Sequence, residues 1–202
     1  MTSGSSSSSS SPRRRGRSVS RKPDRRWIWW LVGGTVAVAL GVGVTTFLRS
    51  QSQRADLSAV QTFPKPEAGH QDGPLTYAQT PPAGGVHNAV WQNCGIYDQP
   101  VANENAVHSQ EHGAVWVTYR PDLSAEAVEV LRGQIRGKRY TLLSPFPDLP
   151  APVVASAWGV QLQLDGPDDP RLAAFITTYA QGSQAPEPGA VCHSGTGIPT
   201  DM

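Results

Sequence analysis

The sequence predicts a small α+β domain carried on a single N-terminal transmembrane helix. Residues 27–48 contain no charged residue, and a run of this length matches the roughly 20 apolar residues that cross the hydrocarbon core of a bilayer. After residue 72, strand-like and helix-like segments follow one another in the order β-α-β-β-α. This order favours an antiparallel sheet with helices on one face.

The N-terminal flank predicts the orientation of the anchor. Residues 1–26 are rich in Ser and Arg and nearly free of apolar side chains, so we expect a disordered tail. The tail carries eight basic residues and one acidic residue, and the positive-inside rule therefore places it in the cytoplasm. Trp27, Trp29 and Trp30 begin the apolar run, as in an interfacial aromatic belt. A cleaved signal peptide is the alternative, but the run is long and no small-x-small site follows Leu48.

The charge of the remaining chain limits its partners. Residues 49–202 carry nine basic and fifteen acidic residues, a balance of −6. An acidic domain argues against binding to nucleic acid. The basic tail is expected to contact anionic lipid, so the membrane is the one partner that the sequence indicates.

The order of elements after the anchor follows from caps, turn residues and apolar spacing. A polar, Pro-containing linker is expected at 49–72, and Asn103 and Gly113 can begin and end the first helix. Ser124 can cap the second, and a flexible tail is expected at 196–202. Within the domain at 73–195 we expect loop with short strands at 73–102, a helix at 103–112, a strand at 114–119, a helix from Ser124 with the apolar stripe Leu123, Val128, Leu131 and Ile135, a strand at 139–143, one or two strands at 153–164 with Gly159 as a bulge, and a helix from Asp168 or Asp169 to Ala180.

The motif His108-Ser-Gln-Glu-His112-Gly is the candidate functional site. His108 and His112 are four residues apart, which places both imidazoles on one face of a helix, with Glu111 beside them. His87 lies in a Pro- and Gly-rich stretch that is free to approach them. Three imidazoles and a carboxylate could hold zinc or copper.

Two cysteines, Cys94 and Cys192, fall in the part of the chain assigned outside the membrane. Disulfides persist in that compartment, and an even pair far apart in sequence predicts a bridge between the C-terminal part and the His87 loop. The alternative is that the thiols, with His193 and Met202, are soft ligands for copper.

Three spaced motifs carry a resemblance to a known family. They are Asn-Cys-Gly-Ile-Tyr at 93–97, Val-His-Ser-Gln-Glu-His-Gly-Ala-Val-Trp-Val-Thr-Tyr at 107–119 and Pro-Glu-Pro-Gly-Ala-Val-Cys at 186–192. Together they resemble the bacterial membrane-anchored proteins of domain-of-unknown-function family 3105, over about residues 70–197. Gln110 stands where that family usually has an apolar residue. The resemblance implies an external location, one domain and a shared His/Glu-His centre, and it implies no activity.

Two classes of function remain open from the sequence. One is a membrane-anchored module that binds a divalent metal, and the other is an anchored structural or protein-interaction domain whose histidines are structural. A zinc-dependent hydrolase is a weaker third hypothesis, because His-x-x-Glu-His matches an inverted peptidase motif but Gly113 ends the helix at once. The sequence therefore leans away from an enzyme and names no protein partner.

The topology is the first testable prediction. Protease added to intact cells should remove the domain after residue 48 and spare the Arg-rich tail, because the positive flank is retained inside. Immunoblotting with antibodies against each end checks this outcome. Digestion of the tail with survival of the domain would reverse the assigned orientation.

Overall fold

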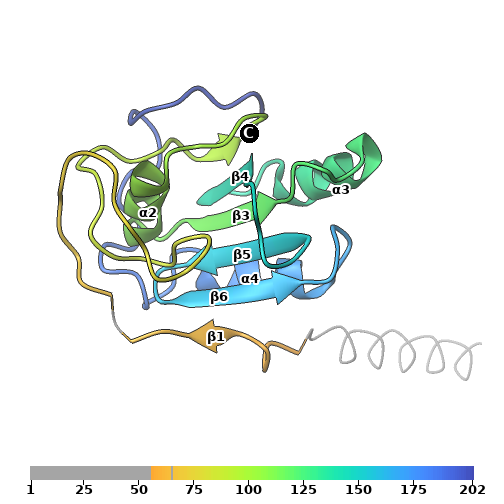
Figure 1. Cartoon of the computed structure of the whole chain (residues 1–202), viewed down its shortest axis with the longest axis horizontal. Helices are drawn as coiled ribbons and strands as arrows, with labels where there is room; N and C mark the ends of the chain where they lie inside the picture. The colour runs from red at the N-terminus through yellow and green to blue at the C-terminus, as the bar shows by residue number, and fades with distance from the viewer. Residues whose placement is uncertain (1–55, 65) are drawn as a thin grey trace, which may run out of the picture. The chain divides into compact units, whose positions relative to one another are not determined.

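A six-stranded mixed sheet lies at the centre of the domain in the computed structural model, which describes residues 56–64 and 66–202 (Figure 1). The strands are β1 (Gln61–Thr62), β2 (Gly95–Ile96), β3 (Val115–Tyr119), β4 (Thr141–Pro145), β5 (Val153–Ala157) and β6 (Val160–Leu164). Their order across the sheet is β1-β6-β5-β3-β4-β2. The fold is therefore α+β, as the sequence predicts.

The predicted tail at 1–26 and transmembrane helix at 27–48 lie outside the residues that the structure describes. Among the helices that it does describe, none has the length and apolar character needed to cross a membrane.

Three helices accompany the sheet: α2 (Asn103–Glu111), α3 (Ala125–Ile135) and α4 (Arg171–Tyr179). The predicted cap of α3 is confirmed, because the Ser124 side chain accepts a hydrogen bond from the backbone N–H of Ala127. Asn103 is not a cap but the first residue of α2, which follows Ala102 without a side-chain cap. Gly159 lies in the turn between β5 and β6 rather than in a bulge.

The prediction of a wholly antiparallel sheet is wrong for three of the six strands. β4 runs parallel to β3 and to β2, whereas β5 and β6 pair in antiparallel fashion. The physical reason is the connection through α3. It starts at the C-terminal end of β3 and brings the chain back to the end of the sheet where β3 begins, so β4 runs in the same direction as β3. A strand-helix-strand crossover of this kind produces parallel neighbours, while the short β5–β6 turn produces antiparallel ones.

The two faces of the sheet are covered differently. Helices α3 and α4 pack on one face, where the side chains of β3, β5 and β6 alternate inward along each strand. Helix α2 lies at one end of the sheet and packs with Trp116 of the opposite face, so the expected placement of all helices on one face holds for α3 and α4 alone (Figure 1). The core between the sheet and these two helices comprises Ile96, Val115, Val117, Tyr119, Leu131, Ile135, Leu143, Val153, Ala155, Ala157, Val160, Leu162, Leu164, Leu172, Phe175 and Ile176.

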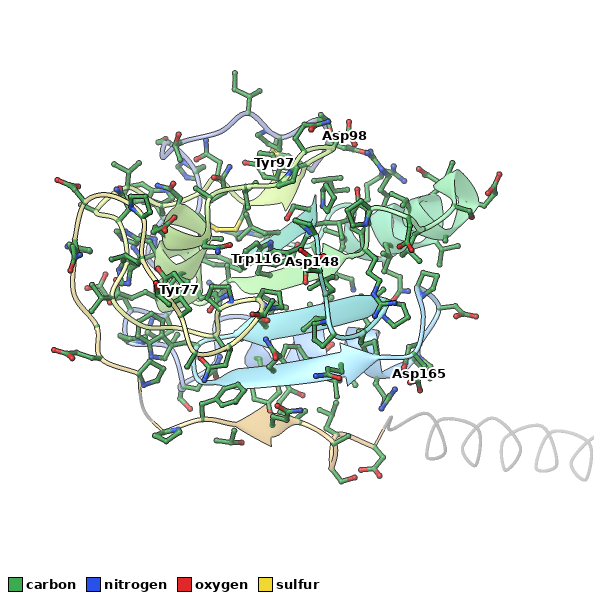
Figure 2. All side chains as sticks on the ribbon, viewed as in Figure 1. Tyr77, Tyr97, Asp98, Trp116, Asp148 and Asp165 are labelled. Carbon is green, nitrogen blue, oxygen red and sulfur yellow. A yellow bond between two sulfur atoms is a disulfide. The ribbon has the colours of Figure 1, made fainter. Side chains whose placement is uncertain are left out.

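The opposite face is buried under loops and contains polar groups that bond to one another. Trp116, which Figure 2 labels over the middle of the sheet, donates from Nε1 to Ser144 Oγ at 3.0 Å. Gln161 donates from Nε2 to the carbonyl of Pro81 at 2.8 Å. Buried polar groups need such partners. The first bond joins β3 to β4, and the second fixes the long loop that precedes β2 against the sheet.

Both ends of the described chain join the sheet. β1 comes from the stretch at 49–72 that the sequence predicts as a linker, and it pairs with β6. Asp201 comes from the predicted flexible tail at 196–202, and it forms a bridge with Ile96 of β2. Backbone pairing at a sheet edge depends little on side chains, so the polar composition of these segments gave no sign of it.

Asp169 provides a test of how α4 is held. Its carboxylate accepts hydrogen bonds from Arg171 N at 3.0 Å, Arg171 Nε at 2.9 Å and Asp165 N at 3.2 Å. These bonds, chiefly those from the Arg171 side chain, hold the pKa of Asp169 below 3.8. Asp169→Ala should therefore lower the free energy of unfolding by about 1–3 kcal/mol at pH 7, as measured by urea denaturation.

The pH dependence of this effect has a definite sign. A carboxyl group whose pKa is lower in the folded state stabilises the fold above its unfolded value and loses that contribution as the pH falls through the folded value. The difference between Asp169→Ala and the wild type should therefore shrink below about pH 3.8. Asp168→Ala, at an exposed neighbouring carboxyl, is the control and should stay within about 0.5 kcal/mol of wild type. Equal losses in the two variants would contradict the assignment.

Candidate metal centre

The second half of helix α2 is buried although it is polar. Ser109 Oγ donates to the carbonyl of Gln92 at 2.6 Å, and Gln110 Nε2 donates to the carbonyl of Pro82 at 3.0 Å. These bonds hold the loop at 82–92 around the helix. The buried polar residues are His108, Ser109, Gln110, Glu111 and His112.

Helix α2 ends where the sequence predicts. Gly113 has a φ of 95°, a region that favours glycine, and a Cβ atom there would lie 2.9 Å from the Cα atom of Gln181. The Gln181 N–H also donates to the carbonyl of Gly113 at 2.8 Å. The close approach leaves His112 at the end of the helix, next to the C-terminal segment.

Three buried imidazoles are each oriented by a hydrogen bond from Nδ1 to a backbone carbonyl. A carbonyl oxygen can only accept, so Nδ1 carries the hydrogen in each ring and Nε2 of the neutral ring carries a lone pair. Histidines that bind metals through Nε2 are held in this way. The pairs are His87 with Gly85, His108 with Asn88 and His112 with Val191, each with an Nδ1–oxygen distance of 2.7 Å.

The Nε2 atoms face other atoms that also carry lone pairs. His108 Nε2 lies 3.0 Å from His112 Nε2, and His87 Nε2 lies 3.0 Å from Glu111 Oε2. His108 Nε2 is 3.9 Å from the same Glu111 oxygen. A proton on one partner satisfies each 3.0 Å contact as a hydrogen bond, and a metal ion placed between the lone pairs can replace that proton.

Burial keeps the central imidazole neutral. Burial, with smaller contributions from neighbouring His112, His87 and His70, lowers the pKa of His108 to about 4, although the hydrogen bond to Asn88 acts in the opposite direction. At neutral pH the ring is therefore uncharged, which is the form that can bind a metal.

Two further residues complete the arrangement, and neither was among the ligands predicted from the sequence. His70 is exposed and joins buried His87, His108 and Glu111 in a group whose ligand atoms all lie within 4.8 Å of one another. Glu187 joins Glu111 and His112 in a second group of the same kind. His70 reaches the site because it forms a bridge with His87, a pairing that no local pattern indicates. Glu187 does lie in the motif at 186–192, and this motif was the only feature of the sequence that pointed to a role for it.

Aromatic rings close the sides of the imidazole cluster. The Trp158 ring contacts His87 edge-on at 5.8 Å between centroids, and Trp158 is almost completely buried. Trp91 lies against both His108 and His112, at 5.6 and 5.1 Å. These rings cover the sides of the cluster with apolar surface, which strengthens the electrostatic interactions of an ion held beside them.

The C-terminal segment forms the remaining wall. The N–H of Glu187 donates to the carbonyl of Glu111 at 3.0 Å, and that of Gly189 donates to the carbonyl of His112 at 3.2 Å. Cys192, next to Val191, is bonded to Cys94, with 5.4 Å between the Cα atoms. The predicted disulfide is thus present in the structure, and it fixes the segment that orients His112. Sulfurs bonded to each other offer no thiolate for the alternative copper site.

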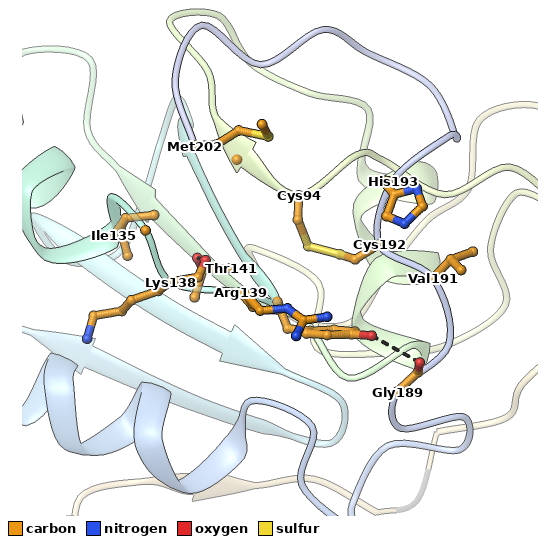
Figure 3. A pocket seen from close by; sticks show the side chains of 13 residues that line it. Cys94, Ile135, Lys138, Arg139, Thr141, Gly189, Val191, Cys192, His193 and Met202 are labelled. Atoms are coloured by element: carbon orange, nitrogen blue, oxygen red, sulfur yellow. Dashed lines mark hydrogen bonds between the residues drawn. A yellow bond between two sulfur atoms is a disulfide. The ribbon is translucent and has the colours of Figure 1, made fainter.

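A separate pocket of about 500 Å³ is lined in part by the two cysteines of this disulfide (Figure 3). Lys138, Arg139, His193 and Met202 line it, and the figure shows the hydrogen bond that ends at the carbonyl of Gly189. None of the residues of the imidazole cluster lines this pocket. His193 and Met202 therefore stand apart from the candidate metal centre.

The structure thus brings the predicted residues together in part. His87, His108 and Glu111 belong to one group of mutually close ligand atoms, as expected for a shared site. His112 lies against His108 but falls into the second group, with Glu111 and Glu187. The local spacing in α2 was a sufficient guide to the His108–His112 contact, while the position of His87 relative to His112 depends on the path of the loop.

A family model described as "Protein of unknown function (DUF3105)" matches residues 70–194. No curated protein and no solved structure matches the chain. The matched residues include all six side chains of the two ligand groups.

The disulfide yields a prediction about this wall. Closing a loop between residues 98 apart in sequence stabilises the fold by up to about 4.7 kcal/mol in the chain-entropy model. The variant Cys94→Ser, Cys192→Ser should lose much of that stability in urea denaturation and should be cleaved first within 182–202 during limited proteolysis. Alkylation of the unfolded, unreduced wild type should label neither cysteine. Labelling of both cysteines would show that the bridge is absent. An unchanged proteolysis pattern in the double variant would show that the bridge does not hold the C-terminal segment.

Proposed function

We propose that this chain, which belongs to the family whose model it matches, binds a divalent transition-metal ion through His87, His108 and Glu111, with His70 as a further ligand. The domain acts as a metal-binding module rather than as an enzyme. His112 lies beside the ion and completes the cluster.

One observation carries the proposal. Three buried imidazoles use Nδ1 to bond to backbone carbonyls and turn the lone pairs of Nε2 toward one another and toward a buried carboxylate. A histidine with a purely structural role is stabilised most when one ring nitrogen donates to an acceptor and the other accepts from a separate donor. Here the Nε2 atoms of His108 and His112 face each other instead, at 3.0 Å.

The distances suit an ion of the zinc or copper class. Two ligand atoms on a tetrahedral ion with bonds near 2.0–2.1 Å lie about 3.3 Å apart. The separations of Glu111 Oε2 from His87 Nε2 and His108 Nε2, 3.0 and 3.9 Å, lie on either side of that value. Imidazole and carboxylate donors suit Zn²⁺ and Cu²⁺, and no thiolate is present in the group to favour Cu⁺.

The proposed location is the outer face of the cytoplasmic membrane, with residues 27–48 as the anchor. The charge-free run and the basic flank before it support this location, as does a disulfide, which persists in oxidising compartments. An extracytoplasmic domain of this kind would meet metal ions before they enter the cell.

The inverted zinc-peptidase hypothesis gains little support from the site. That mechanism needs the glutamate as a general base facing a metal-bound water. In this structure Glu111 Oε2 lies 3.0 Å from His87 Nε2 and is placed as a ligand. Helix α2 also ends directly after the motif, so no longer helix is available to carry a further ligand.

Metal content is the decisive measurement. Purified full-length protein, stripped of metal and then dialysed against Zn²⁺ or Cu²⁺, should retain at least one ion per chain by elemental analysis. The variant His108→Ala, His112→Ala should lose it, because the lone pairs that attract the ion are gone. Saturating metal should also raise the melting temperature of the wild type, since a ligand that binds only the folded state stabilises it.

The matched control is His193→Ala, which alters an exposed histidine outside both ligand groups. This variant should keep the metal content and the thermal shift of the wild type. His70→Ala changes an exposed ligand and should weaken binding without unfolding the domain, which circular dichroism would verify. Full metal content in the double variant would leave the histidines with a structural role.

A further inference from the structure

The six possible ligands divide into two groups that share one carboxylate. The first group, His70, His87, His108 and Glu111, has three nitrogen donors and one oxygen donor, and the second adds His112 and Glu187 to the same Glu111. Within each group the ligand atoms lie within 4.8 Å of one another, but the six do not form a single group. Two ligands on opposite sides of one zinc-like ion are at most about 4.2 Å apart, so one ion cannot serve a set this extended.

Glu111 is suited to contact two ions. A carboxylate has two oxygen atoms, and centres that share such a group hold their ions about 3.5–4 Å apart. Glu111 Oε2 lies 3.0 Å from His87 Nε2, on the side of the first group. The residue is also a member of the group that contains His112 and Glu187.

Hydrogen bonds to backbone carbonyls hold the second group in place. The N–H of Glu187 donates to the carbonyl of Glu111, and Nδ1 of His112 donates to the carbonyl of Val191 in the same C-terminal segment. One segment therefore both orients the imidazole and supplies the next carboxylate. Glu187 Oε2 lies 3.9 Å from His112 Nε2, whose imidazole is almost completely buried.

The geometry points to a dinuclear centre: we propose that His112, Glu187 and Glu111 hold a second divalent cation beside the first, with Glu111 bridging the two. This inference rests on the proposed function, because the first ion must be bound for the centre to be dinuclear. The second position has one nitrogen and two carboxylate groups, and the Glu187 side chain is 63% exposed. It should therefore bind more weakly than the nitrogen-rich first position and keep coordination places for water.

A titration of metal-free full-length protein with Zn²⁺ tests the proposal. Native mass spectrometry and calorimetry should give two ions per chain, bound in two steps. Glu187→Gln removes the charge of an exposed side chain and should leave the fold intact, while it weakens the second step about tenfold or more and the first step far less. Glu67→Gln, at another exposed glutamate outside both groups, is the matched control and should keep both steps.

Copper gives a second readout that depends on the distance between the ions. With two equivalents of Cu²⁺, the electron paramagnetic resonance spectrum of the wild type should show spin coupling between neighbouring ions. The spectrum of Glu187→Gln should be that of an isolated Cu²⁺ ion in the first position.

The outcomes separate the two proposals. Two ions in the wild type and one in Glu187→Gln support the dinuclear centre. One ion in both proteins overturns the second position and leaves the first in place. One wild-type ion that is lost in Glu187→Gln overturns the dinuclear centre and assigns the single ion to the group of Glu111, His112 and Glu187 instead of to the first position. Two uncoupled ions in both proteins also overturn it. No bound ion in the wild type rejects the proposed function itself.

Discussion

The hydrogen bonds from imidazole Nδ1 atoms to backbone carbonyls are the constraint on which the rest of the site depends. They join helix α2 to two segments that lie far from each other in the sequence, the loop around Asn88 and the segment around Val191. Each bond gives a backbone carbonyl a partner and also fixes a ring. The same contacts that complete the fold therefore determine where the Nε2 lone pairs meet, so the site and the packing of the loops cannot be altered independently.

The sheet supplies the rigid base for these loops. One face is buried under α3 and α4 by apolar side chains that alternate along β3, β5 and β6. The other face bonds to the loop before β2 through polar side chains such as Gln161. A loop anchored in this way can be ordered without regular structure of its own, and it brings His70 and His87 to the end of α2. The disulfide does the same for the C-terminal segment from the opposite side.

Much of the local structure could be predicted because it rests on interactions between near neighbours. The Ser124 cap, the stop at Gly113 and the contact of His108 with His112 each involve residues within five positions of one another. The pairing of the strands could not be predicted in this way. The parallel arrangement of β3 and β4 follows from the direction in which α3 returns the chain, and the alternation of side chains is the same in a parallel and an antiparallel pair.

The sequence by itself determined which side chains are available for the site, since it places two imidazoles and a carboxylate on one helical turn and two cysteines in the same domain. Only the tertiary structure decided which other side chains join them. His70 enters through a backbone bridge and Glu187 through a segment held by its own N–H group, and neither interaction depends on a pattern of residue types. Backbone hydrogen bonds between distant segments depend little on which side chains those segments carry. For this reason the part of the site on helix α2 is local, whereas the entry of His70 and Glu187 and the division into two groups around Glu111 are properties of the folded chain.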